Sequence, residues 1–539
     1  MRKILFYLSW LVLFSCGKPT SVDLYTNAKI YTSNDKQPEA RAFAVSEGVI
    51  IGIGDEDNLR SQFNIEQTID LEGRTVVPGF IDAHCHFLNL GFQEYQVDLV
   101  GTASFEEIVK RIIVFQEANQ MDFIQGRGWD QNDWEDKTFP NKKLLDSLFP
   151  DTPIALSRID GHAILCNQAA LDLGGVTSDS KIDGGTVVLE NGVPTGVLVD
   201  NAESLVMRYW PKPTRQERIN ALQAAEKTCV ALGLTTVDDA GLNRDDIELI
   251  DSLHKTGDLK IRVYAMASAN ADNLEYYLSR PIVKTDRLHM RSFKYYVDGA
   301  LGSRGALLRA PYSDAPHSYG LPVNSLDDFK MTASRIATSN YQMNTHAIGD
   351  SANHVVLNTY KDLLKDQQDR RWRVEHAQVL SMDDFNLFEN IIPSVQPTHA
   401  TSDMYWAEDR LGSERMQGAY ALKSLLQVNG RVALGTDFPV ERVSPFLTFY
   451  AATARQDLSG YPREKFKANE ALSRQEALYG MTIWAAYANF ESEEKGSLEV
   501  GKMADFVVLD QDILTVPLSQ IPKTKVIQTY IAGEAQIKK

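Results

Sequence analysis

Cysteine is scarce in this sequence, with four residues in 539. Cys16 follows an apolar N-terminal run, so only Cys85, Cys166 and Cys229 belong to the body of the chain. Three scattered cysteines do not make the dense disulfide framework that stabilises many small secreted domains. We therefore expect the fold to depend on a large buried apolar core, which a chain of this length can supply.

Positive charge is also in deficit, with 55 lysine and arginine residues against 72 aspartate and glutamate residues. Nucleic-acid binding requires clustered positive charge, so we expect no nucleic-acid partner. The 43% hydrophobic and 24% charged content is typical of a globular enzyme.

Only one long apolar run occurs, from Ile4 to Phe14, and it is short for a membrane span. It follows the basic residues Arg2 and Lys3 and ends just before Cys16. This resembles a bacterial lipoprotein signal, which predicts removal of residues 1–15 and a lipid on Cys16. We expect an exported protein, periplasmic or anchored at the outer membrane, that meets the membrane only through this lipid. An ordinary secretory signal with a chance cysteine is the alternative.

The two ends of the remaining chain read as short β-strands. Residues 22–75, 496–512 and 525–536 show period-two apolar alternation broken by glycine and asparagine. We predict a small β-sandwich formed from residues 22–75 and 491–539, although two independent hairpins would give the same pattern.

A strand–helix rhythm fills the region between these ends and indicates a parallel sheet. Eight buried strands are expected at 75–87, 234–241, 260–268, 292–299, 342–350, 371–378, 391–400 and 431–440. Eight is the number of a TIM barrel, so we predict an α/β fold with a (β/α)₈ barrel over residues 76–490. A doubly wound open sheet is the alternative.

The stretch from about 91 to 215 is too long for one connection between a strand and the next. It contains its own strand-like segments and a hairpin signal at Asn191-Gly192. We predict an insertion that covers the C-terminal mouth of the barrel and shapes the substrate pocket.

Histidine and aspartate gather where the predicted barrel strands end. His84 and His86 are two apart on one strand and therefore share a face. His346, His376 and Asp437 end three further strands, at the edge where barrel active sites are built. Each alone is as readily a buried structural residue, but together they predict a metal site.

Lys294 lies on another predicted strand and is a less direct candidate. A free ammonium has no lone pair for a cation, whereas a lysine that has taken up CO₂ carries a carbamate that can bridge two metals. An ordinary ion-paired lysine is the alternative.

Several motifs resemble the amidohydrolase superfamily. The matching motifs, in chain order, are VVPGFIDAHCHF, SRIDGHAILCNQAAL, KYYVDGALGSR, NTHAIGD, RVEHAQ, GTDFPV and GSLEVGKMADFVVLD. The sequence is most similar to the branch of amidohydrolase family 3 that includes the YtcJ-like group and N-substituted formamide deformylases. The resemblance runs from about residue 22 to 539 and implies a metallohydrolase barrel.

This resemblance also implies roles for the strand-end residues. His84, His86 and Asp437 would hold the more buried of two divalent metals. The ligand types suit zinc, with iron, manganese or nickel as alternatives. His346 and His376 would hold the second, with the carbamylated lysine bridging the pair; a single-metal site is the alternative. Asp437 would accept a proton from the attacking water and pass it to the leaving nitrogen.

Further polar residues in the same motifs are candidates for substrate binding, and each could equally make a structural hydrogen bond. They are Trp129, Asp160, His162, Asp298, Arg304 and His399. Glu375 and Asp350 are expected to orient ligand side chains from behind.

Together these features predict a hydrolase that cleaves an amide, N-acyl or N-formyl C–N bond of a small molecule. The same activated water would attack an ester, a lactone or a cyclic amide. A surface lipoprotein that binds a ligand without turnover is the alternative from a different class.

Overall fold

The computed structural model describes residues 22–366 and 369–536. The predicted signal peptide, residues 1–15, and the predicted lipidation site, Cys16, lie outside the described residues. Within the described ranges, no helix combines the length and the apolar character needed to cross a membrane.

Eight parallel strands form the central sheet, in the order β22-β21-β20-β19-β18-β16-β15-β8. Their bounds are β8 Phe80–Cys85, β15 Leu234–Leu242, β16 Arg262–Ser268, β18 Leu288–Tyr296, β19 Gln342–Ala347, β20 Arg373–His376, β21 Ile392–Val395 and β22 Ala433–Leu434. Six of them fall inside the predicted segments, β15 ends one residue beyond its segment, and β18 begins four residues before its segment. The (β/α)₈ barrel is thereby confirmed, and the open doubly wound sheet is not observed.

The barrel closes between its first and last strands just beyond the end of β22. Asp437 N–H donates to the His84 carbonyl, and His86 N–H donates to the Phe438 carbonyl, both at 2.7 Å. The backbones approach so closely that a Cβ on Gly435 would lie 2.5 Å from the His84 nitrogen. Glycine at 435 therefore lets two metal-site segments meet.

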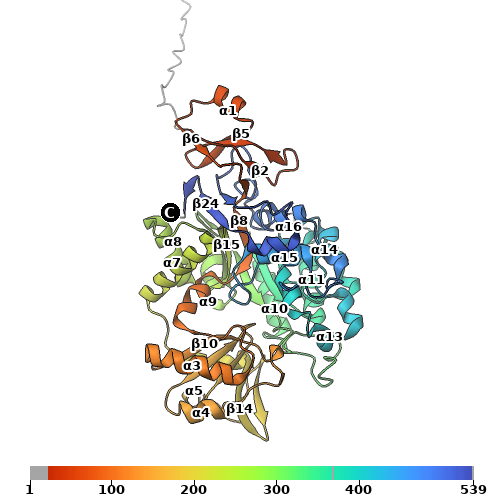
Figure 1. The fold of residues 1–539 in the computed structure, drawn as a ribbon. Coiled ribbons are helices and arrows are strands. Elements are labelled where there is room, and N and C mark those ends of the chain that lie inside the picture. The colour runs from red at the N-terminus through yellow and green to blue at the C-terminus, as the bar shows by residue number, and fades with distance from the viewer. Residues whose placement is uncertain (1–21, 367–368, 537–539) are drawn as a thin grey trace, which may run out of the picture.

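Amphipathic helices surround the sheet (Figure 1). The main ones are α7 Arg215–Ala231, α8 Arg244–Thr256, α9 Ala271–Leu278, α10 Leu326–Ala337, α11 Asp350–Leu364, α14 Leu422–Asn429 and α15 Pro445–Ala454. The start of α7 shows how sequence sets a helix boundary. Thr214 and Glu217 form a reciprocal capping box that satisfies two backbone N–H groups.

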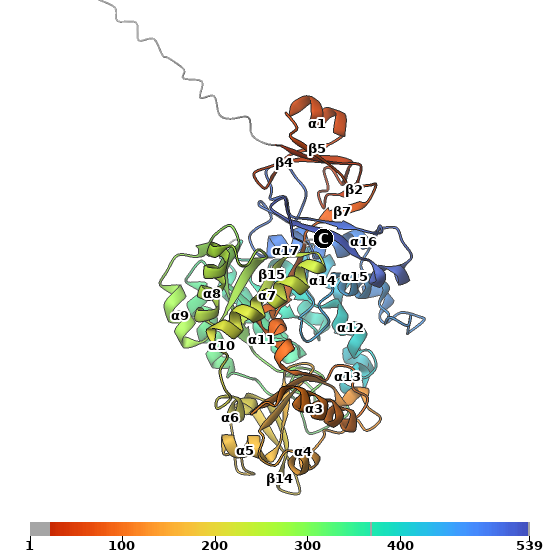
Figure 2. The same cartoon turned by 60° about the vertical axis from the view of Figure 1, so that its left-hand side comes forward.

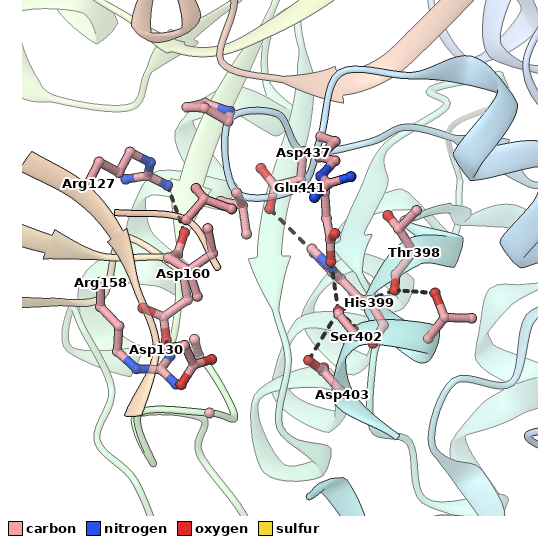
Figure 3. Close-up of a pocket in the computed structure, with 18 of the residues that line it drawn as sticks. Arg127, Asp130, Arg158, Asp160, Thr398, His399, Ser402, Asp403, Asp437 and Glu441 are labelled. Carbon is pink, nitrogen blue, oxygen red and sulfur yellow. Dashed lines mark hydrogen bonds and ion pairs between the residues drawn. The ribbon is translucent and has the colours of Figure 1, made fainter. Parts of the chain in front are cut away.

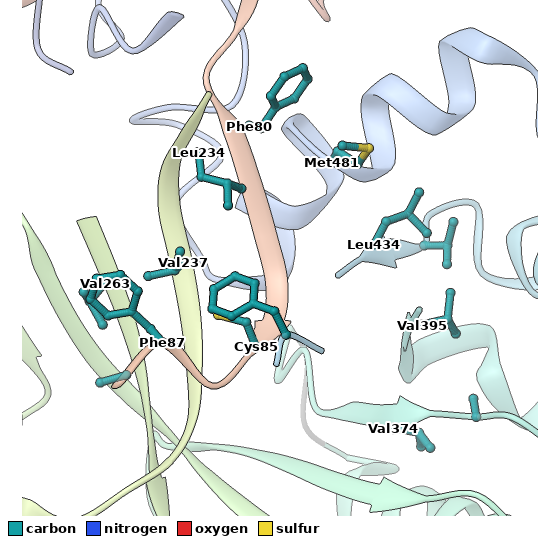
Figure 4. Packing of buried hydrophobic residues seen from close by; sticks show 14 of the residues in the cluster. Phe80, Cys85, Phe87, Leu234, Val237, Val263, Val374, Val395, Leu434 and Met481 are labelled. Atoms are coloured by element: carbon teal, nitrogen blue, oxygen red, sulfur yellow. The ribbon is translucent and has the colours of Figure 1, made fainter. Parts of the chain in front are cut away.

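The largest apolar core lies between the barrel strands and these helices. Phe80, Val237 and Val263 belong to it and are at most 1% exposed (Figure 4). The core fixes the strands from outside, which leaves the strand ends free to carry polar residues.

Both ends of the described chain build a two-sheet sandwich at one end of the barrel (Figure 1). One sheet contains β5 Val49–Gly54, β4 Ala42–Ser46, β1 Asp23–Thr26 and β6 Gln67–Asp70. The other contains β25 Glu534–Ala535, β24 Val526–Ile531, β23 Phe506–Leu509, β7 Thr75–Pro78, β2 Lys29–Tyr31 and β3 Glu39–Ala40. Tyr25 stacks on Phe43 at 4.9 Å and meets Phe506 edge-on at 5.0 Å, so aromatic residues from both ends share one core.

A separate six-stranded sheet lies at the other end of the barrel, opposite the sandwich (Figure 2). Its strands are β13 Gly185–Glu190, β14 Val193–Asp200, β12 Ala163–Cys166, β11 Ile154–Arg158, β10 Ile124–Trp129 and β9 Val97–Asp98, with helix α3 Phe105–Asn119 against it. The β13–β14 hairpin turns at Asn191 and Gly192, both with positive φ. This sheet and its helices are called the insertion below.

Candidate metal centre

Six side chains from the ends of the barrel strands meet at one mouth of the barrel, and we call them the strand-end cluster. They are His84, His86, Lys294, His346, His376 and Asp437. Strand register explains why some of these side chains lie close together. Tyr296 on β18 pairs with His346, and Ala347 on β19 pairs with His376. Parallel strands in register bring their carboxyl ends to the same edge.

His84 is held by a buried chain of charged groups. Its Nδ1 lies 2.5 Å from Glu375 Oε2, and the other oxygen of that carboxylate accepts from Arg373 Nε at 2.7 Å. Burial raises the pKa of Glu375, but the charges of Arg373 and His84 outweigh it and hold the pKa at about 2. The carboxylate therefore keeps the Nδ1 proton of His84 and turns Nε2 towards the cluster.

Oxygen acceptors also fix the rings of His86 and His376. His86 Nδ1 lies 3.0 Å from the Ala240 carbonyl, and His376 Nδ1 lies 2.8 Å from Gln396 Oε1. In each ring the Nδ1–H donates to this oxygen, so the Nε2 lone pair is available to a cation.

Asp437 lies among these imidazoles. Its Oδ1 is 3.2 Å from His86 Nε2 and 3.7 Å from His84 Nε2, and its Oδ2 is 3.4 Å from His399 Nε2. Burial raises the pKa of the carboxyl, but the His399 and His86 contacts outweigh it and hold the pKa well below its usual range. Asp437 has φ of +62°, so the backbone holds its side chain in an uncommon conformation at this site.

Lys294 reaches the same point from β18. Its Nζ lies 3.0 Å from His84 Nε2 and 4.6 Å from the centre of the Tyr296 ring. Burial lowers the pKa of the ammonium to about 8. More of the amine is then uncharged at neutral pH than in an exposed lysine, and the uncharged amine is the form that reacts with CO₂.

His346 completes the cluster on the side facing the insertion. Its Nε2 lies 3.5 Å from the Gly299 carbonyl, and its ring centre is 4.5 Å from that of His376. Asp298 lies behind it, where its carboxylate accepts backbone N–H groups from Ile348 and Gly349. Burial raises the pKa of Asp298 to about 7.

The donor set fits a divalent cation. One ligand atom each from His84, His376 and Asp437 lie within 4.8 Å of one another, and all three residues are buried. Asp437 Oδ1 is also buried without a hydrogen-bond partner. Buried carboxylate oxygens normally have hydrogen-bond partners, so one oxygen left without a hydrogen bond between imidazole rings is the arrangement expected of a metal ligand.

The cluster opens into a cavity of about 950 Å³ between the barrel and the insertion (Figure 3). Three of the predicted substrate-binding residues, Asp160, His162 and His399, line it. Figure 3 shows His399 and Glu441 on the barrel side, and Arg127, Asp130 and Asp160 on the other.

Three further candidates lie elsewhere, which corrects their predicted place. Trp129 is fully buried in the core of the insertion, where its Nε1 donates to the Leu156 carbonyl. Arg304 lies outside the cavity and pairs with Asp314 at 2.9 Å. Asp298 is buried and supports backbone, as described above. None of these three residues lines the cavity.

Of the two residues expected to orient ligands from behind, Glu375 contacts His84, whereas Asp350 accepts from the Arg309 backbone. Sequence reasoning missed three residues of the site. Gln396 contacts His376, Glu441 contacts His399, and Arg127 lines the cavity. Arg127 has a local signal, because it stands between two glycines in a strand.

Comparison with known families gives an extensive match. The family model described as "Amidohydrolase family" matches residues 67–535. Protein LONG AFTER FAR-RED 3 of Arabidopsis thaliana is 33% identical, covering 98% of this chain and 94% of the relative. Putative amidohydrolase YtcJ of Bacillus subtilis is 31% identical over 94% and 97%. N-substituted formamide deformylase of Arthrobacter pascens is 26% identical over 94% and 96%.

A solved structure agrees with these sequence matches. An uncharacterized metal-dependent hydrolase from Pyrococcus horikoshii superposes with a TM-score of 0.75 and 27% identity. The alignment covers 92% of this chain and 99% of that one, so sandwich, barrel and insertion are all included.

Proposed function

Because this chain belongs to the amidohydrolase family, we propose that it is a metal-dependent hydrolase that cleaves an amide, N-acyl or N-formyl C–N bond of a small molecule. The observation that carries the proposal is the buried Asp437 carboxylate among histidines whose Nδ1 atoms are already occupied. A hydrolase needs a base for its attacking water, and the position of an ionised, buried carboxylate among these histidines supports that role for Asp437.

The residues of the site would have different roles in hydrolysis. A bound divalent metal would lower the pKa of a water and polarise the carbonyl oxygen. Asp437 accepts the water proton at a carboxylate oxygen and returns it to the leaving nitrogen. His399, whose pKa is raised to about 10 because its contacts with Asp437 and Glu441 outweigh burial, keeps that carboxylate ionised.

We further propose two metal positions. His84, His86 and Asp437 would hold one ion, and His346 and His376 the other, with the lysine of β18 as a carbamate between them. The imidazole and carboxylate ligands favour zinc. The 3.0 Å approach of the lysine amine to His84 supports this placement of the bridge.

The name of one relative suggests which substrates to try first. The name N-substituted formamide deformylase describes removal of a formyl group from nitrogen, and this relative aligns over 94% of this chain. The activated water would also attack an ester, a lactone or a cyclic amide, so these belong in the same screen. A protein that binds its ligand without turnover is the alternative from another class.

The test is metal content per chain together with hydrolysis of N-substituted formamides, N-acetyl amino acids and matched esters. The purified protein is loaded with zinc in bicarbonate, as wild type, as His84→Ala, and as His317→Ala for an exposed histidine outside the cavity. We expect bound metal and turnover in wild type and in the control, and loss of both in His84→Ala. Metal without turnover of any class supports the ligand-binding alternative, and absence of metal overturns the hydrolase.

A further inference from the structure

The positively charged residues of the insertion that face the cavity differ in how they are paired. Arg158 is saturated, because Asp130 and Asp160 hold its two terminal nitrogens and Gln131 accepts from its Nε at 2.9 Å. His162 is paired as well, with Nδ1 at 2.8 Å from the buried carboxylate of Asp200.

Arg127, on β10 of the same wall, is not paired in this way. Among the described residues it donates one hydrogen bond, from a terminal nitrogen to the Ile159 carbonyl at 2.9 Å, and forms no ion pair. Its Nε is buried without a partner. A guanidinium has five N–H donors, so most of its capacity remains unused on the wall of the cavity.

The backbone beside Arg127 leaves room for its side chain. A Cβ on Gly161 would lie 3.3 Å from one terminal nitrogen of Arg127, so glycine allows the guanidinium to lie flat against the loop. Arg442 also lines the cavity, but it is exposed, and water can satisfy it. Arg127 is partly buried, so leaving it without an anion is costly.

The carboxylates that line the cavity form no ion pair with Arg127 among the described residues. Most are already engaged: Glu441 contacts His399, Asp403 accepts from Tyr420 and Gln378, and Asp457 accepts from Tyr405. These three carboxylates therefore neither pair with Arg127 nor stand free for a cation.

We propose that Arg127 binds a carboxylate of the substrate, at the end of the molecule away from the bond that is cleaved. The inference rests on the proposed hydrolase function, because it places the cleaved bond at the strand-end cluster across the cavity. The planar fork of arginine matches a carboxylate with two parallel hydrogen bonds. A phosphate dianion fits less well, since one cation would face it in a cavity rich in acidic groups.

The substrate class that follows is an N-acyl or N-formyl compound with a free carboxylate, as in an N-acylated amino acid. The probes are N-acetylglycine, N-acetylleucine and N-acetylphenylalanine, each compared with its carboxamide, which has the same shape and no charge. Binding to the zinc-loaded full chain is measured by calorimetry, and amino-acid release is measured in parallel. The variants are Arg127→Gln, Arg127→Lys and, as a control with the same change of charge, Arg208→Gln at an exposed position of the insertion outside the cavity.

We expect at least one carboxylate to bind wild type about 10- to 100-fold more tightly than its carboxamide, the range of a charge-assisted hydrogen-bonded pair. Arg127→Gln should bring this ratio close to one while leaving carboxamide affinity unchanged. Arg127→Lys should keep part of the preference, and Arg208→Gln all of it.

The inference is overturned if no carboxylate binds wild type better than its carboxamide, or if Arg127→Gln or Arg127→Lys leaves the ratio unchanged. The two proposals fail separately. Turnover of acid and carboxamide alike would retain the hydrolase and remove the role of Arg127. A carboxylate preference that depends on Arg127, with no turnover of any probe, would retain the anion site and remove the hydrolase.

Discussion

The cavity has two walls that are built in different ways. On the barrel wall the side chains come from the ends of strands of one parallel sheet, and His84, His86 and His376 are each fixed by an oxygen atom behind the ring. On the insertion wall the side chains come from a separate sheet, and Arg127 has one partner and a free guanidinium edge. The histidines of the barrel wall have hydrogen-bond partners behind them and leave nitrogen lone pairs for a metal. Arg127 on the insertion wall leaves N–H donors for an organic ligand.

His84 on the barrel wall and His162 on the insertion wall also differ in protonation, although His399 on the barrel wall has a raised pKa like His162. Burial lowers the pKa of His84 to about 4, so it is neutral and able to bind metal. Burial also lowers the pKa of His162, but its bond to Asp200 outweighs this and raises the pKa to about 9. On the proposed function, the barrel wall would supply the chemistry and the insertion wall would select the substrate.

The largest effect is expected from Asp437→Asn on the barrel wall. Loss of the base should lower kcat by about 10²- to 10⁴-fold for every substrate alike, because the proton transfer is common to all of them. Steady-state kinetics on a formamide, an N-acetyl amino acid and an ester measure this, with metal content as the control. A loss confined to one substrate would contradict the division between the walls.

Glu375→Gln should act through the metal instead. The amide cannot hold the Nδ1 proton of His84 as a carboxylate does, and removing such an outer partner costs about 10- to 100-fold in metal affinity. Competition with a chelator measures the affinity, and saturating zinc should restore most of the activity. An unchanged affinity would show that Glu375 serves stability alone.

Asp200→Asn tests the insertion wall through pH. The folded pKa of His162 is raised from 6.5 to about 9, so its stabilising contribution is fully present below pH 6.5 and is lost as pH rises through 9. Wild type should therefore exceed the variant by about 2 kcal/mol in free energy of unfolding near pH 6, and the gap should close above pH 9. Urea unfolding at both values measures it, and an equal gap at both would mean that His162 is uncharged.

The smallest effect is expected from Trp129→Phe, in the core of the insertion and away from the cavity. The change removes the hydrogen bond to the Leu156 carbonyl and should cost about 1 kcal/mol of stability. Denaturant unfolding measures the cost. The ratio of kcat/KM between an acid and its carboxamide should not move; a shift would mean that the insertion core itself takes part in selection.

The barrel could be predicted because its signals are local. Each strand is short and buried, and a histidine such as His346 or His376 lies in its last two positions. Parallel strands in register then bring these ends together without further information. The sandwich could be predicted for the same reason, from period-two alternation at both ends of the chain.

The insertion wall could be predicted only in part. A tryptophan in a strand, such as Trp129, reads equally as a pocket residue or a core residue, and packing decides between them. Arg304 stands in a glycine-rich turn, and its direction depends on Asp314, ten residues further on. Whether Arg127 has an ion-pair partner depends on residues from several segments of the chain, so no short motif predicts it.

The antiparallel pairing of β7 with β23 can form only late in the synthesis of the chain. β7 leads directly into the first barrel strand, yet its partner, Phe506–Leu509, leaves the ribosome only after all eight barrel strands. Until then one edge of β7 has no neighbour and is open to association with other chains. A translation product that stops before residue 506 carries every catalytic candidate and still exposes this edge, so we expect proteolysis to remove it.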